Sequence, residues 1–274
     1  MMSLNNIRGD KVNIKKFTYR IDKYYRDNLD IIIDKAIPNK WDCLAIFFGR
    51  EGSGKSTLAF QTALYTDPSF SLKRVVFTSK QFEELIDNVP DGSSVVWDEA
   101  ITGASSVDHA NKISSSIIKK LVQIRKKKLK IFLCYSYIYS LNSYFVGRCL
   151  FSVYVYAKNF EDRGYAYFYS QPQTETLYRL MKEKYRYNCN KAISKAYKSF
   201  YFQFSKVLCL DEMSYDRKKE VSRINEVGVN KDRKRLVQLI SWLKKTKLST
   251  YKKIGKVLGI HPNSISSMIT RFNQ

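Results

Sequence analysis

The chain has 274 residues and a formal net charge of +23, which comes from 48 basic and 25 acidic side chains. Apolar residues make up 44% of the chain, enough for a packed core. The length suits one α/β domain of roughly 200 residues with a small appendage. The basic excess favours a polyanionic partner, nucleic acid or an anionic membrane, with Lys side chains spread over every surface as the alternative.

Cysteine and histidine usage argues against a zinc site. The five cysteines form no C-x-x-C pair, and the chain has only two histidines. An odd, scattered set of cysteines is typical of a reducing compartment, and it predicts a cytoplasmic location. Residues 1–17 have no apolar signal core and the longest apolar runs are about five residues, so no membrane span is expected.

Strand-like and helical patterns alternate from residue 41 onwards, after a polar and basic N-terminal segment (1–40) with a short helix around 21–35. This alternation predicts an α/β domain over 41–215, with a mostly parallel sheet flanked by helices on both faces. The predicted strands are 44–49, 74–79, 93–100 and 129–136, and the predicted helices are 56–65, 80–89 and 114–128.

Aromatic residues dominate the middle of the chain. Two alternating runs on either side of EDRG predict a hairpin over 151–170, and a helix is predicted over 174–187. These aromatic side chains are interpreted as sheet core, with stacking on single-stranded nucleic acid as the alternative. Residues 191–228 show no clear pattern apart from the aromatic run at 201–204.

A phosphate-binding loop is the most specific signal in the chain. GREGSGKS, residues 49–56, matches G-x-x-x-x-G-K-[ST] in full, between a predicted strand and a predicted helix. Backbone N–H groups of such a loop point at one anion, and the helix N-terminus adds its dipole. Lys55 is expected to reach the β- and γ-phosphates, and Ser56 to ligate Mg²⁺. The predicted nucleotide-binding residues are Gly49, Glu51, Gly52, Ser53, Gly54, Lys55, Ser56 and Thr57.

Two adjacent carboxylates end the buried strand in VVWDEA. Asp98 is predicted to bind Mg²⁺ directly or through water, and Glu99 to orient and deprotonate the attacking water. A GTPase would need N-K-x-D, and NKD at 230–232 lacks that spacing. A metabolite kinase would leave Glu99 and the basic tail without a role. Hydrolysis of a nucleoside triphosphate is therefore the favoured reaction.

Residues 49–57 and 94–99 together resemble P-loop ATPases with an additional central strand and a catalytic glutamate, a group that includes RecA-like motors and AAA+ proteins. The resemblance covers roughly residues 41–157. It implies a central parallel sheet, ATP with Mg²⁺, and a homo-oligomeric ring or filament. The order of strand, Asp-Glu, long basic helix, strand and Gly-Arg segment looks most like FtsK/HerA and viral packaging or zonular-occludens-toxin-like ATPases.

The same resemblance implies further site residues. In these groups a polar residue after the next strand senses the γ-phosphate, and Tyr135 or Ser136 occupies that place. The DNA-pumping branch often has Gln there, so AAA+ helper ATPases stay open. A neighbouring subunit commonly supplies an arginine, for which Arg148 in YFVGRC and Arg125 in QIRKKK are the candidates. Surface roles are the alternative for both arginines.

The basic excess is concentrated at the C-terminus, where residues 217–274 carry fifteen Lys or Arg against three Asp or Glu. After a linker at 216–229, residues 230–247 form a basic amphipathic pattern, and 248–274 read as helix, turn, helix. The spacing of Gly255, Gly259 and Ile265 resembles the helix-turn-helix of repressors and of replication-initiator or recombinase tails. A small all-α DNA-binding domain is therefore predicted over 230–274.

Within that domain the second helix is expected to begin near Pro262 and to enter the major groove. Lys252, Lys253 and Lys256 are predicted to contact backbone phosphates. The outward-facing side chains predicted to contact bases or phosphates are Asn263, Ser264, Ser266, Ser267 and Arg271. A helical hairpin used for packing or protein contacts is the alternative.

These signals together predict a DNA-associated ATPase that uses ATP and Mg²⁺ as an oligomer. The work on DNA is either translocation or packaging, or the assembly of a replication or transposition complex. The alternative is an ATP-gated DNA-binding regulator with little turnover.

Overall fold

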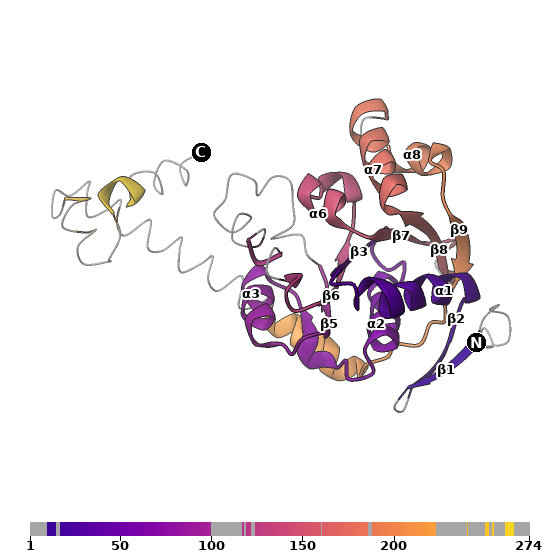
Figure 1. Cartoon of the computed structure of the whole chain (residues 1–274). Helices are drawn as coiled ribbons and strands as arrows, with labels where there is room; N and C mark the ends of the chain where they lie inside the picture. Colours follow the sequence, from indigo (N-terminus) through magenta and orange to yellow (C-terminus); the bar gives the residue numbers. More distant parts are fainter. Residues whose placement is uncertain are drawn as a thin grey trace. The chain divides into compact units, whose positions relative to one another are not determined.

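The computed structural model describes residues 10–14, 17–99, 117, 119–121, 124–159, 161–185, 188–222, 240, 250–251, 254 and 261–265. The chain divides into two compact units, Met1–Asp216 and Arg217–Gln274. The elements of the first unit are drawn in Figure 1. Its helices are α1 (Lys23–Ile31), η2 (Ile32–Ala36), α2 (Lys55–Thr66), η3 (Leu72–Arg74), α3 (Ser79–Asn88), η5 (Ile138–Ser140), α6 (Ser143–Arg148), α7 (Gln171–Arg179), η6 (Leu180–Lys184) and α8 (Cys189–Lys195).

A seven-stranded sheet forms the centre of this unit, in the order β4-β5-β6-β3-β7-β8-β9. β4, β5, β6, β3 and β7 run parallel, and β8 and β9 extend the sheet antiparallel. The strands are β3 (Cys43–Phe48), β4 (Val75–Val76), β5 (Ser94–Trp97), β6 (Lys130–Tyr135), β7 (Phe151–Ala157), β8 (Arg163–Ser170) and β9 (Phe200–Gln203). β1 (Asp10–Ile14) and β2 (Phe17–Ile21) form a separate hairpin.

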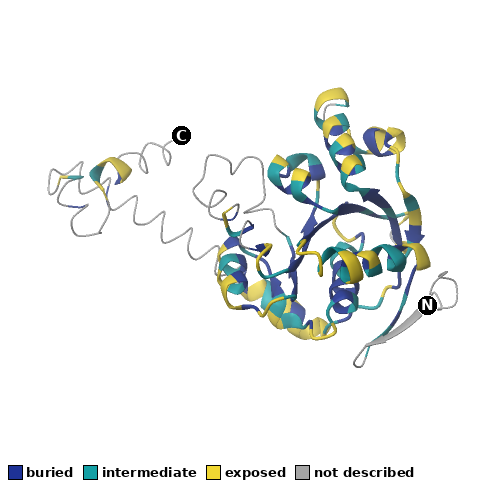
Figure 2. Cartoon of the chain, in the orientation of Figure 1, coloured by how far each residue is buried: buried dark blue, intermediate teal, exposed yellow. Residues whose placement is uncertain are grey.

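Helices cover both faces of the sheet because the side chains of its central strands alternate between two cores. Leu44, Ile46 and Phe48 of β3 join one cluster with residues of α3, α6 and α7. Cys43, Ala45 and Phe47 of the same strand join the second cluster, with residues of α1 and α2. β3 is therefore buried on both faces, as expected for a central parallel strand. Figure 2 shows the buried strands between helices whose outer sides are exposed.

The predicted α/β architecture is confirmed. The predicted strands correspond to β3, β4, β5 and β6, and the predicted hairpin at 151–170 is the antiparallel pair β7 and β8. β4 is only two residues long, shorter than the six residues predicted at 74–79. Part of the predicted N-terminal segment packs into the core, because Tyr19, Tyr25 and Leu29 are buried in the second cluster.

The tyrosines of β7 and β8 stack on one another. The rings of Tyr154 and Tyr156 have centroids 5.7 Å apart, and those of Tyr156 and Tyr167 are 5.1 Å apart, with interplanar angles of 13° and 19°. The Lys198 ammonium lies 4.2 Å from the centroid of the Tyr167 ring. These ring faces are used within the sheet, which favours the packing interpretation over stacking on nucleic acid bases.

Only part of the second unit belongs to the described residues. Ile240, Ile254 and Ile265 are buried in one apolar cluster, and Tyr251 packs against it. Residues 262–265 are helical. Most of the predicted helix-turn-helix, including the predicted turn at Gly259, lies outside the described residues. Within the described part of the chain, no helix is long and apolar enough to cross a bilayer.

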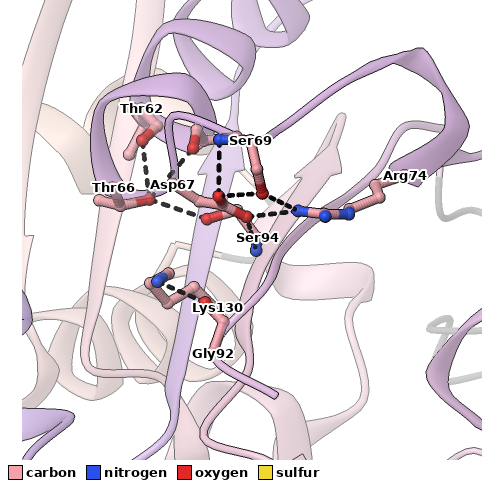
Figure 3. Close-up of polar contacts among 9 residues, drawn as sticks. Thr62, Thr66, Asp67, Ser69, Arg74, Gly92, Ser94 and Lys130 are labelled. Carbon is pink, nitrogen blue, oxygen red and sulfur yellow. Dashed lines mark hydrogen bonds and ion pairs between the residues drawn. The ribbon is translucent and has the colours of Figure 1, made fainter. Parts of the chain in front are cut away.

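A polar network around Asp67 ties α2 to the edge of the sheet at which β5 and β6 begin (Figure 3). The Asp67 carboxylate accepts hydrogen bonds from the Ser94 amide at 2.9 Å and the Ser69 hydroxyl at 2.6 Å, and it pairs with Arg74. Burial opposes ionisation of Asp67, but these hydrogen bonds and the guanidinium outweigh it and hold the pKa of Asp67 below its ordinary value.

Replacing Asp67 by Asn is expected to lower the free energy of unfolding at pH 7 by ~1–3 kcal/mol, since buried bonds to an ionised group are lost. A depressed pKa in the folded state stabilises the fold above the unfolded pKa, and this contribution disappears as the pH falls through the folded pKa. The difference between Asp67→Asn and the unsubstituted chain should therefore shrink in acid. Urea unfolding at neutral and acidic pH measures it, with the exposed Asp91→Asn as control; a difference that does not change with pH would contradict it.

Candidate nucleotide-binding site

The loop between β3 and α2 has the backbone of a phosphate-binding loop. Gly49, Gly52 and Gly54 all have positive φ, of 146°, 74° and 102°. A Cβ on Gly49 would lie 2.0 Å from the carbonyl oxygen of Val155, so only glycine allows β7 to pass so close. Gly54 is the N-cap of the twelve-residue helix α2. The loop thus lies at a helix N-terminus, where backbone N–H groups favour an anion.

Two side chains of the loop are suited to binding such an anion. The Lys55 ammonium donates hydrogen bonds to the carbonyl oxygens of Gly49 and Arg50, both at 2.8 Å. Burial lowers the pKa of Lys55 from its ordinary value. The Ser53 hydroxyl is buried and has no hydrogen-bond partner among the described residues. An ammonium that donates to loop carbonyls and a buried hydroxyl without a partner among the described residues both fit the binding of phosphate oxygens.

Asp98 follows β5 directly and faces the start of α2. The carboxylate is 2% exposed, and its Oδ1 accepts a hydrogen bond from the Ser56 hydroxyl at 2.8 Å and from the Glu99 amide at 3.1 Å. A buried carboxylate beside a hydroxyl at the end of a phosphate loop supplies the hard oxygen ligands that Mg²⁺ prefers. The chemistry of these two residues therefore fits magnesium, as the sequence predicts.

Tyr215 also contacts Asp98, and no sequence pattern indicates this. Its hydroxyl donates a hydrogen bond to Asp98 Oδ2. Burial, followed by the charge of Asp98, raises the pKa of Tyr215 far above its ordinary value, so the phenol keeps its proton and is the donor. The residue lies 117 positions away from Asp98 in sequence, in the region where the sequence shows no clear pattern.

Glu99 occupies an unusual backbone conformation. Its φ of 55° is left-handed, which is rare and costs about 1 kcal/mol or more for a residue other than glycine. The chain therefore turns sharply immediately after Asp98, at the end of the sheet where the phosphate loop lies. Strained conformations of this kind concentrate at functional sites. The backbone of Glu99 is therefore consistent with the functional role predicted for its carboxylate.

The remaining predicted loop residues lie at the same edge of the sheet. Glu51 is exposed in the loop, and Thr57 is half-buried in the first turn of α2. The Ser136 carbonyl oxygen accepts a hydrogen bond from the Gly49 amide at 3.3 Å, so the residue after β6 is next to the loop. The structure thus brings together Ser136, the loop, Asp98 and Glu99.

The two candidate arginines lie at the other edge of the sheet. Arg148 forms an ion pair with Asp42 at 2.8 Å, and the Arg125 guanidinium donates to the Lys40 carbonyl at 3.2 Å. Lys40 and Asp42 precede β3, whereas the phosphate loop follows it. Neither arginine contacts the loop of its own chain in the described residues. An action on a neighbouring subunit stays a prediction for both.

Cavities flank the loop on the side of β7. One of about 600 Å³ is lined by the loop from Arg50 to Ser53 and by Tyr154, Tyr156, Asn159 and Asn190. A second, of about 480 Å³, shares Arg50, Tyr154 and Asn190 with it and reaches Ser136. Aromatic and amide side chains beside a phosphate loop can accommodate the nucleoside part of a nucleotide. No motif indicated the lining residues Tyr154, Tyr156, Asn159 and Asn190.

The predicted DNA contacts are only partly described. Asn263 and Ser264 are exposed in the helical residues 262–265. Lys252, Lys253, Lys256, Ser266, Ser267 and Arg271 lie outside the described residues. Their contacts with DNA stay predictions.

The mostly parallel sheet and the loop at the end of β3 define a P-loop NTPase type of α/β fold. No family model and no curated protein sequence matches the chain. Two structures of the genome packaging NTPase B204 from Sulfolobus turreted icosahedral virus 2 are similar. The complex with ATP-gammaS is 13% identical, with a TM-score of 0.34 over 48% of this chain and 94% of that chain. The sulfate complex is 16% identical, with a TM-score of 0.36 over 60% and 94%.

Proposed function

We propose that the chain is a Mg-dependent ATPase that works on DNA. The observation that carries the first half is the contact between Ser56 and Asp98. The last residue of the phosphate motif and the acid that ends β5 share a hydrogen bond of 2.8 Å, although they are 42 positions apart. With Lys55 in the loop and Glu99 next to Asp98, one edge of the sheet has groups suited to binding the phosphates, holding Mg²⁺ and activating a water.

Each residue has a distinct role in this proposal. The loop amides and Lys55 bind the phosphates. When the nucleotide binds, the Lys55 ammonium donates its hydrogen bonds to phosphate oxygens in place of the loop carbonyl oxygens. Ser56 and Asp98 would hold Mg²⁺, which neutralises charge on the phosphates when bound. Glu99 orients and deprotonates the attacking water, and Ser136 senses the γ-phosphate. The nucleoside extends into the cavity beside Tyr154.

The position of β6 supports a protein that hydrolyses ATP over one that only switches state when it binds a nucleotide. β6 lies between β3, which leads into the phosphate loop, and β5, which is followed directly by Asp98. This is the additional central strand that the sequence resemblance implies for ATPases with a catalytic glutamate. In that group ATP is commonly hydrolysed between subunits, so a homo-oligomer completed by an arginine in trans is part of the proposal.

The second half of the proposal rests on charge. The chain carries a net charge of +23, and the second unit has five times as many basic as acidic residues, fifteen against three. A basic helix-turn-helix at the C-terminus would hold the ATPase on DNA, where hydrolysis drives translocation, packaging or the assembly of a complex. The other candidate, an ATP-gated DNA-binding regulator, has the same site but little turnover.

ATP hydrolysis measured at increasing concentrations of a short DNA duplex tests both halves together. The unsubstituted chain should hydrolyse ATP faster with DNA. A variant with Lys252, Lys253 and Lys256 all changed to Ala should keep basal turnover and bind DNA ~10-fold or more weakly. Its binding should also depend less steeply on salt concentration, because about three fewer counterions are released from the DNA. A matched control changes the exposed Lys23, Lys73 and Lys195 to Ala. Turnover that does not respond to DNA favours the regulator, and equal DNA binding by both variants contradicts the role of the tail.

A further inference from the structure

The hydroxyl of Tyr215 holds the second oxygen of the Asp98 carboxylate. Oδ1 accepts from Ser56 and from the Glu99 amide, while Oδ2 accepts from Tyr215. Asp98 is 2% exposed and Tyr215 is 8% exposed, so the hydrogen bond between them is shielded from water. Donors on both oxygens restrict rotation of the carboxylate about its Cβ–Cγ bond.

The chain after β9 is anchored along α2 on its way to this contact. The Gln61 amide of α2 donates to the carbonyl oxygens of Ser205 and Val207, both at 2.8 Å. Cys209 is buried in the same core as α2. The ring of Phe204 lies so close to Gly54 that a Cβ there would be 3.2 Å from it. Residues 204–215 therefore contact α2 near Gly54 and at Gln61 before Tyr215 reaches the metal-binding acid beside the start of the helix.

The ring of Tyr215 is itself held in place. It lies edge-on to Phe60 of α2 at a centroid distance of 5.3 Å and an angle of 75°. It also packs against Phe77, which follows β4, at 5.8 Å. Packing on two sides fixes the direction of the hydroxyl before any nucleotide binds. Such pre-organisation is the property that a residue supporting a metal ligand needs.

We propose that Tyr215 is a positioning residue for the magnesium site, which orients the Asp98 carboxylate through Oδ2 so that Oδ1 stays next to Ser56. This inference rests on the proposed function, since it assigns magnesium to Ser56 and Asp98. Tyr215 itself does not touch the nucleotide. It acts on the ion through Asp98, in the way that hydrogen-bonded outer residues support metal ligands elsewhere.

The test is Tyr215→Phe in the full chain, which removes the hydroxyl and keeps the ring. Tyr65→Phe is a matched control, because Tyr65 lies on α2, against which Tyr215 packs, and its hydroxyl likewise donates to a carboxylate, that of Asp30, at 2.6 Å. Binding of a fluorescent ATP analogue is measured in EDTA and over a magnesium titration. Tyr215→Phe should bind as the unsubstituted chain does in EDTA, and should need ~10–100-fold more magnesium for half of the magnesium-dependent gain in affinity. Tyr65→Phe should leave both values unchanged.

Three results would overturn the inference. An unchanged magnesium requirement in Tyr215→Phe would show that Asp98 needs no such support. A lower requirement would show that the hydroxyl competes with the ion. If the unsubstituted chain itself gains no affinity from magnesium, the proposed function fails together with the inference. Thermal unfolding of both variants accompanies the titration, because a purely structural role would lower stability and leave the ratio of affinities with and without magnesium unchanged.

Discussion

Replacing Glu99 by Gln is expected to lower ATP turnover by ~10²–10⁴-fold, the usual contribution of a general base. Gln keeps the size of the side chain and can still hydrogen bond to water, but it cannot take a proton. The left-handed φ of 55° and the amide hydrogen bond to Asp98 involve only the backbone of residue 99, so the variant should keep the geometry of the site. Binding of ATP should therefore persist while hydrolysis is lost.

Steady-state phosphate release and binding of a fluorescent ATP analogue separate these two effects. The matched control is Glu84→Gln, an exposed residue of α3 whose ion partner Lys80 is also exposed. It should change neither value. Wild-type turnover in Glu99→Gln would contradict the assignment of Glu99 and leave the binding functions of the loop intact. A loss of binding equal to the loss of turnover would indicate that Glu99 supports the site instead of acting on water.

Replacing Lys55 by Ala is expected to weaken nucleotide binding by roughly 10²-fold and to lower turnover by a further ~10²–10³-fold. Each charge-assisted hydrogen bond to a phosphate contributes ~1.5–3 kcal/mol, and loss of one charged contact to the transition state typically has the larger effect on rate. Lys55 is the basic side chain that the phosphate motif itself supplies. Its burial at the N-terminus of α2 makes its charge more effective than that of an exposed lysine.

Binding and turnover are again measured separately, with the exposed Lys73→Ala as control. Lys55→Ala also removes two hydrogen bonds to the loop carbonyls, so thermal unfolding without nucleotide should be recorded. Binding that is unaffected in Lys55→Ala would rule out the loop as the phosphate site. Weaker binding with an unchanged kcat would indicate that Lys55 stabilises the bound substrate and its transition state equally.

Much of the first unit could be predicted because its signals are local. Apolar runs bounded by polar turns predicted the central strands, and the aromatic alternation around EDRG predicted the hairpin of β7 and β8. The β4 prediction was too long, because Phe77 and Thr78, which follow the two strand residues in RVVFTS, are residue types that also favour strands. The order β5-β6-β3 was implied only by resemblance, because hydrogen bonding between strands depends on partners that are distant along the chain.

The partners of individual side chains were less predictable. Arg148 was chosen for its place after a strand, and the structure pairs it with Asp42 at the opposite edge of the sheet from the phosphate loop. Nothing in the local pattern distinguishes an arginine that pairs within its own chain from one that faces a neighbour. Tyr154 and Tyr156 read as sheet residues, and only the path of the loop beside β7 makes them part of a cavity wall.

The phosphate loop, the Asp98-Glu99 pair and the basic C-terminus could be predicted without a structure, because each is a contiguous pattern whose chemistry follows from residue type and spacing. Three contacts could be seen only in the fold: Ser56 donates a hydrogen bond to Asp98, the Ser136 carbonyl lies next to the loop, and Tyr215 donates to Asp98 from 117 positions away. These contacts arise from the packing of α2 and of residues 204–215 on one sheet. Packing of this kind depends on all of its partners at once, so no short stretch of sequence encodes it.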